Sequence, residues 1–165
     1  MIVGGSQGAK IFENITQWLS NDLKNFKFIL IRGKNIKREF YESNVITYDY
    51  FEDIGLLYKA SDIVISRAGA STVNELMAYG KFSIYIPYKY AASDHQYYNV
   101  RWLAEKGLSK VIREEDLNIN ILKNHIQNAF KTNLQNIERK LNELAILDSE
   151  KIIIREIENV IFKKN

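Results

Sequence analysis

Short apolar runs alternate with amphipathic helical segments along almost the whole chain, and this alternation limits the fold more than any other feature. Buried strands are predicted at 26–31, 45–47, 62–66, 83–86 and 109–112, after a strand stub at 1–3. Helices are predicted over 9–20, 53–60, 71–79, 94–106, 117–131, 133–146 and 149–162. Because alternating strands and helices build parallel sheets covered on both faces, we expect an α/β fold with a doubly wound parallel sheet and extra, charged C-terminal helices that could pack partly outside it.

Composition excludes several classes of function. The 23 basic and 20 acidic residues leave a net charge of +3 without a basic stripe, so no nucleic acid partner is expected. The chain has no cysteine and only two histidines, His95 and His125, so neither a disulfide framework nor a metal cofactor is expected. No apolar run approaches the roughly 18 residues of a membrane span, and no signal peptide is recognisable. We therefore expect a cytoplasmic chain without a transmembrane segment.

The strand stub at the start of the chain is unusually short. Met1, Ile2 and Val3 lead directly into a glycine turn, whereas strands typically have about five or six residues. We infer that part of the first strand, or a whole preceding region, lies outside this sequence.

The first glycine turn comprises residues 4–9, with the sequence GGSQGA. The candidate ligand-binding residues here are Gly5, Ser6, Gln7 and Gly8. Without side chains, glycine backbones let N–H groups approach an anion, and the following helix adds the positive end of its dipole. The alternative is that the glycines only close a tight turn between strand and helix, and a glycine pair alone does not separate the two interpretations.

A second glycine turn follows the strand at 62–66 and opens another helix. The backbone N–H groups of Gly69 and Ala70, with the hydroxyls of Ser71 and Thr72, could hold a phosphate. Arg67, just before this turn, could neutralise that phosphate or pair with a carboxylate.

Glu75 lies one helical turn further along and has two open interpretations. Its carboxylate could accept hydrogen bonds from the two hydroxyls of a ribose. It could instead complete a capping box with Thr72, and the spacing alone favours the capping box.

The third candidate segment, residues 88–99, combines tyrosines with polar side chains at a helix start. Aromatic rings suit the apolar faces of a sugar, and polar groups on a loop suit its hydroxyls. His95 and Gln96 are the candidates for sugar binding. The alternative is a surface helix capped by Ser93 or Asp94.

These segments together resemble a known family. The stretches GGSQGA at 4–9, SRAGASTVNEL at 66–76, IPYKYAASDHQYYNV at 86–100 and GLSKVIREEDL at 107–117 are similar to the C-terminal half of the MurG glycosyltransferases. The resemblance implies a GT-B architecture, in which two Rossmann-like domains face a cleft. It also implies that residues 1–165 form a single donor-nucleotide domain, with the N-terminal acceptor domain absent.

The resemblance implies roles for residues that contact the nucleotide. Ser6 and Gln7 would lie near the diphosphate and sugar of the donor. The backbone of Phe51 would read the edge of the uracil, and Ser71 and Thr72 would contact the diphosphate.

The remaining implied roles concern ribose and sugar hydroxyls. Glu75 would bind the ribose, and His95 with Gln96 would contact N-acetylglucosamine. Turn chemistry and resemblance together give this substrate-binding set: Gly5, Ser6, Gln7, Gly8, Phe51, Arg67, Gly69, Ala70, Ser71, Thr72, Glu75, His95 and Gln96. No catalytic residue is predicted in this chain, because the family's base is expected in the N-terminal domain.

The family's reaction transfers N-acetylglucosamine from UDP-GlcNAc, with inversion, to the undecaprenyl-linked muramyl-pentapeptide of peptidoglycan synthesis. The resemblance thus implies a donor half that binds UDP-GlcNAc without turnover, needs no metal or other cofactor, and meets the lipid-linked acceptor through the missing domain or a partner chain. The full enzyme would be peripheral on the cytoplasmic face of the plasma membrane. The alternatives are the donor subunit of a split transferase with another acceptor, a non-catalytic UDP-sugar-binding module, and a UDP-GlcNAc epimerase, which ranks last.

Overall fold

The computed structural model describes residues 1–4, 10–33 and 42–162. Its sheet has six strands: β1 (Ile2–Val3), β2 (Phe28–Ile31), β3 (Val45–Tyr48), β4 (Ile63–Ser66), β5 (Phe82–Tyr85) and β6 (Ser109–Val111). All neighbouring strands are parallel, in the order β3-β2-β1-β4-β5-β6. The predicted parallel sheet is therefore confirmed, and β1 is the short strand that the sequence indicates.

The strand order places a topological switch point beside β1. From β1 the chain proceeds outward to β2 and β3, and then returns to β4 on the other side of β1. Ile2 is aligned with Leu30 on one side and with Ile65 on the other. Sheets with this order bind ligands outside the carboxyl ends of their strands at the switch point. The segments that follow β1 and β4 are therefore the expected ligand-binding segments.

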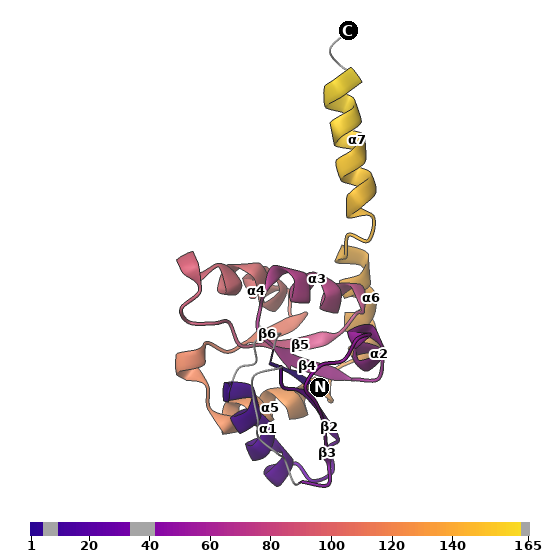
Figure 1. The fold of residues 1–165 in the computed structure, drawn as a ribbon. Helices are drawn as coiled ribbons and strands as arrows, with labels where there is room; N and C mark the ends of the chain where they lie inside the picture. Colours follow the sequence, from indigo (N-terminus) through magenta and orange to yellow (C-terminus); the bar gives the residue numbers. More distant parts are fainter. Residues whose placement is uncertain (5–9, 34–41, 163–165) are drawn as a thin grey trace.

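Helices cover both faces of this sheet. The helices of the described residues are α1 (Lys10–Asp22), α2 (Ile54–Lys59), α3 (Ala70–Ala78), α4 (His95–Glu105), α5 (Ile119–Ala129), α6 (Leu134–Leu144) and α7 (Ser149–Phe162), with short 3₁₀ turns η1 (Ala92–Asp94) and η2 (Glu114–Asp116), and all but α7 pack on the domain. In Figure 1, α3 and α4 lie above the sheet and α1 and α5 lie below it. Apolar stripes on the helices pack against the strands, so that Leu19, Leu30 and Leu103 are fully buried.

The C-terminal helices differ in how they use their apolar residues. Helix α6 buries Ile137 and Leu141 against the domain. Helix α7 buries no residue, and Figure 1 shows it extending away from the rest of the fold. The expectation that C-terminal helices pack partly outside the core is confirmed for α7.

Candidate functional site

The candidate site lies at the carboxyl edge of the sheet, where β4 and β5 end and α3 and α4 begin. Of the predicted residues, Gly5, Ser6, Gln7 and Gly8 lie outside the described residues, so their assignment stays a prediction. The others are placed on the loops and helices that follow β3, β4 and β5.

Helix α3 begins at Ala70, one residue before the predicted start, and Gly69 is its N-cap. A Cβ added to Gly69 would meet no atom within 4 Å, so the space in front of this helix start is open. Ser71 is exposed and Thr72 is half-buried, both in the first turn. Unpaired N–H groups of a first turn attract anions, so this end of α3 can receive a phosphate.

The capping-box interpretation of Glu75 is wrong. Gly69 occupies the cap position, no side chain caps α3, and Thr72 is already the third residue of the helix. Glu75 is exposed, and its Oε2 accepts a hydrogen bond of 3.3 Å from the phenol of Tyr58 on α2. The carboxylate is therefore not used to cap the helix, which removes the competing interpretation of this residue.

Two amide side chains near the start of α4 form hydrogen bonds with the turn between β4 and α3. The Oε1 of Gln96 accepts hydrogen bonds from the backbone N–H of Tyr88 at 2.9 Å and from that of Ala68 at 3.4 Å. Asn99, one turn later, donates from Nδ2 to the carbonyl oxygen of Ala68 at 2.9 Å. Both backbone groups of Ala68 are thus held by α4.

The orientation of the Gln96 amide follows from these bonds, because its oxygen must face the two N–H donors. Its Nε2 makes no hydrogen bond within the described part of the chain and can donate to a ligand. Asn99 was not among the predicted site residues. Its signal is the spacing of three from Gln96, which puts both amides on one side of α4.

His95 is exposed, and its ring is oriented by a contact of 2.9 Å between Nδ1 and the carbonyl oxygen of Ala92. A carbonyl only accepts, so Nδ1 carries the proton and Nε2 is left as an acceptor when the ring is neutral. The residues before it, Ser93 and Asp94, have left-handed backbones with φ of 51° and 54°. Asp94 occupies the cap position of α4 without capping it, and instead pairs with Arg113 at 2.8 Å.

Arg67 is held within the fold at the carboxyl end of β4. Its Nη1 donates to Glu114 Oε2 at 2.7 Å and to the carbonyl oxygens of Ile86 and Pro87 at 3.1 and 3.2 Å. The guanidinium also lies 5.2 Å from the ring centre of Tyr88. The carboxylate-pairing interpretation of Arg67 is therefore confirmed, while a phosphate contact stays a prediction.

Phe51 lies between β3 and α2, where its half-buried ring packs edge-on against Tyr48 at 5.0 Å. The backbone N–H and C=O of Phe51 form no hydrogen bond with another described residue. Free backbone groups at this point are what the predicted contact with a uracil edge requires.

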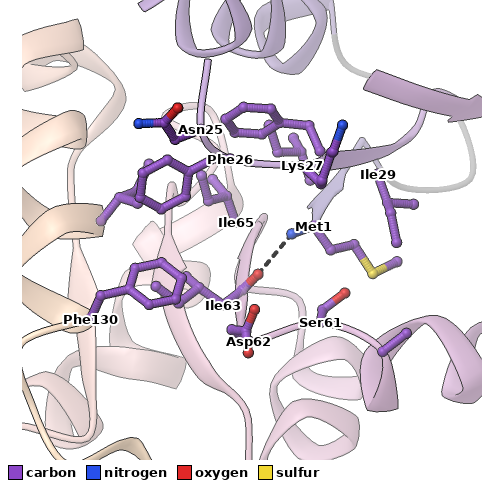
Figure 2. A pocket seen from close by; sticks show the side chains of 14 residues that line it. Met1, Asn25, Phe26, Lys27, Ile29, Ser61, Asp62, Ile63, Ile65 and Phe130 are labelled. Atoms are coloured by element: carbon purple, nitrogen blue, oxygen red, sulfur yellow. Dashed lines mark hydrogen bonds between the residues drawn. The ribbon is translucent and has the colours of Figure 1, made fainter. Parts of the chain in front are cut away.

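A pocket of about 380 Å³ lies at the opposite edge of the sheet (Figure 2). It is lined by Met1 and the starts of β2 and β4, together with Phe26 and Phe130. The Met1 nitrogen donates to the carbonyl oxygen of Ile63 at 2.8 Å. Because ligands of such sheets bind at the carboxyl ends, this pocket is separate from the candidate donor site.

Among the residues that the structure describes, no three histidine, aspartate or glutamate side chains gather as metal ligands would. The expectation that no metal is needed stays a prediction. None of the helices in the described ranges is long and apolar enough to cross a membrane.

Comparisons with known proteins agree with this geometry. The chain is 43% identical over 159 residues to the UDP-N-acetylglucosamine--N-acetylmuramyl-(pentapeptide) pyrophosphoryl-undecaprenol N-acetylglucosamine transferase of Sulfurihydrogenibium sp. (strain YO3AOP1), covering 96% of this chain and 46% of that protein. It is 37% identical over 147 residues to the transferase of the same name from Aquifex aeolicus (strain VF5), covering 84% and 40%. The chain thus spans less than half the length of these relatives.

A solved structure shows the same fold. The crystal structure of Acinetobacter baumannii MurG superimposes with a TM-score of 0.83 at 23% identity, covering 96% of this chain and 49% of that one. The Rossmann-like half of a GT-B glycosyltransferase that the sequence indicates is therefore the fold observed. The profile of the glycosyltransferase family 28 C-terminal domain matches residues 1–155, a span that contains the sheet and every residue of the candidate site, and the chain belongs to that family.

Proposed function

We propose that this chain is the UDP-GlcNAc-binding half of an inverting N-acetylglucosaminyltransferase that adds N-acetylglucosamine to the undecaprenyl-linked muramyl-pentapeptide in peptidoglycan synthesis. The observation that carries this proposal is the arrangement around α3. An open helix start at Gly69 precedes an exposed carboxylate, Glu75, which serves no cap and is anchored by Tyr58. The names of the relatives supply the reaction, since they are transferases of N-acetylglucosamine from UDP-N-acetylglucosamine.

The site suits a nucleoside diphosphate sugar in three parts. The first turn of α3 would receive the diphosphate, since N–H groups and the helix dipole stabilise negative charge there. Glu75 would accept hydrogen bonds from the ribose hydroxyls, and the backbone of Phe51 would meet the uracil. The free amide nitrogen of Gln96 and the exposed His95 would face the sugar hydroxyls.

These groups also define what the chain contributes to transfer. When the acceptor hydroxyl attacks the anomeric carbon, the bond to UDP breaks and charge grows on the diphosphate. The start of α3 would stabilise that charge, and we expect no metal to be needed. No residue of this chain is proposed as the base, so the isolated chain binds the donor but does not transfer its sugar. The acceptor domain, or a partner chain at the cytoplasmic face of the membrane, would supply the rest.

Calorimetric titration of the chain with UDP-GlcNAc tests this proposal, with UDP-glucose and ADP as competing ligands and Glu75→Ala as the variant. Binding that prefers UDP-GlcNAc and is weakened by Glu75→Ala is expected. Equal affinity for ADP would refute the donor assignment. Transfer of N-acetylglucosamine by the isolated chain would refute the assignment of the base to another domain.

A further inference from the structure

Tyr58 is a buried polar side chain that the proposed function does not yet use. It lies on α2, only 1% of its surface is exposed, and its ring packs against Tyr79 with 5.5 Å between ring centres. Its hydroxyl donates to Glu75 Oε2 at 3.3 Å. A core tyrosine is thus connected, through one hydrogen bond, to the exposed carboxylate of the candidate donor site.

The phenol is a donor at every pH at which the protein would work. Burial raises the pKa of Tyr58 well above its usual range, and the negative charge of Glu75 raises it further. The O–H proton therefore stays in place and can face the carboxylate, which accepts hydrogen bonds but cannot donate them when ionised.

The position of this hydroxyl is fixed by its surroundings. Tyr79, whose ring supports that of Tyr58, lies so close to Gly55 on α2 that a Cβ there would come within 2.8 Å of the Tyr79 Cζ. Helix α2, which carries Tyr58, therefore packs directly against the C-terminal end of α3. Glu75, in contrast, is exposed and would otherwise sample several rotamers.

We propose that Tyr58 is a positioning residue of the donor site, which holds the Glu75 carboxylate in the one orientation that can receive both hydroxyls of a ribose. This inference rests on the proposed function, because it assigns the ribose to Glu75. Oε2 is anchored by the phenol, and Oε1 receives no hydrogen bond from another described residue. The anchored carboxylate meets the ribose without first losing side-chain freedom, which strengthens binding.

The test compares two ligands and a set of variants by calorimetry on the full chain. UDP carries the ribose 2′- and 3′-hydroxyls, and 2′,3′-dideoxyuridine diphosphate lacks both. Tyr58→Phe removes only the phenol oxygen. Tyr79→Phe is the matched control, since it removes a phenol oxygen from the neighbouring ring, and no hydrogen bond joins that oxygen to Glu75 among the described residues.

Tyr58→Phe is expected to weaken UDP binding about three- to tenfold, within the range for the net contribution of one typical hydrogen bond that is lost or misplaced. Binding of the dideoxy ligand should not change, and Tyr79→Phe should bind both ligands like the unaltered chain. In a Glu75→Ala background, the Tyr58→Phe substitution should have no further effect on UDP, because the carboxylate it positions is gone.

The other outcomes separate failure of this inference from failure of the proposed function. Equal weakening of both ligands by Tyr58→Phe means a general structural role and overturns the positioning assignment. Unchanged UDP binding in Tyr58→Phe, with weakening in Glu75→Ala, overturns it as well while leaving the donor site intact. If Glu75→Ala binds UDP as tightly as the unaltered chain, the ribose assignment itself is refuted.

Discussion

Replacing Arg67 by alanine should destabilise the fold by about 3 kcal/mol. Arg67 and Glu114 form an ion pair of 2.7 Å in which each side chain keeps only 18% of its exposure. Breaking a fully buried pair costs about 3–5 kcal/mol, and we reduce this to about 2 because solvent still reaches both groups. The carbonyl oxygens of Ile86 and Pro87 each lose a donor as well, which adds about 1 kcal/mol together.

Urea unfolding measures this loss, and the chain offers a matched control. Arg101 pairs with Glu105 at the same 2.7 Å, but the two side chains are 54% and 59% exposed. Arg101→Ala should therefore unfold at almost the same urea concentration as the unaltered chain. If Arg67→Ala and Arg101→Ala unfold at the same concentration, the argument from burial is refuted.

A double substitution tests the mechanism of this destabilisation. Glu114→Ala in the Arg67→Ala background removes the carboxylate that was left without a cation, so the double variant should lose less stability than the two single losses combined.

The affinity for nucleotides separates the two proposed roles of Arg67. If it touches the donor's phosphates, Arg67→Ala weakens binding of UDP more than of uridine, whereas a purely structural role weakens both alike.

Two further predictions concern other parts of the chain. Gly80→Ala should lower the melting temperature, because φ is +64° and a Cβ would lie 3.2 Å from the Cα of Glu138, and an unchanged temperature would contradict this. A chain ending at Asp148 should keep the melting temperature of the longer chain, since α7 buries no residue, and a large fall would show that α7 packs on the domain.

The alternation of apolar runs and amphipathic segments predicted the elements of the sheet and its helices well. Strand β4, for example, lies within the predicted run 62–66, and α7 has the predicted bounds. The strand order could not be predicted, because it depends on which buried faces pair across the sheet rather than on local pattern.

The candidate site was predicted less completely, for identifiable reasons. The prediction of a capping box was wrong, because it used only the spacing of Thr72 and Glu75 in the sequence. The helix begins after Gly69, whose backbone is extended. The partner of Arg67 is 47 residues away along the chain, which no short motif reveals. Tyr58 carries no local signal either, because its sequence pattern is that of any buried aromatic residue.

Hydrogen bonds within the fold hold the groups around β4 and α3, and this bears on how the donor would bind. Gln96 and Asn99 hold the turn through the backbone of Ala68, and Tyr58 holds Glu75. Ordering these groups therefore need not be driven by the donor. Preorganised sites lose less conformational entropy on binding. They also stabilise the negative charge that grows on a leaving group without having to rearrange. A domain that keeps the donor in a fixed pose can thus leave the choice of acceptor and the proton transfer to another part of the enzyme. We propose that this chain acts as such a domain.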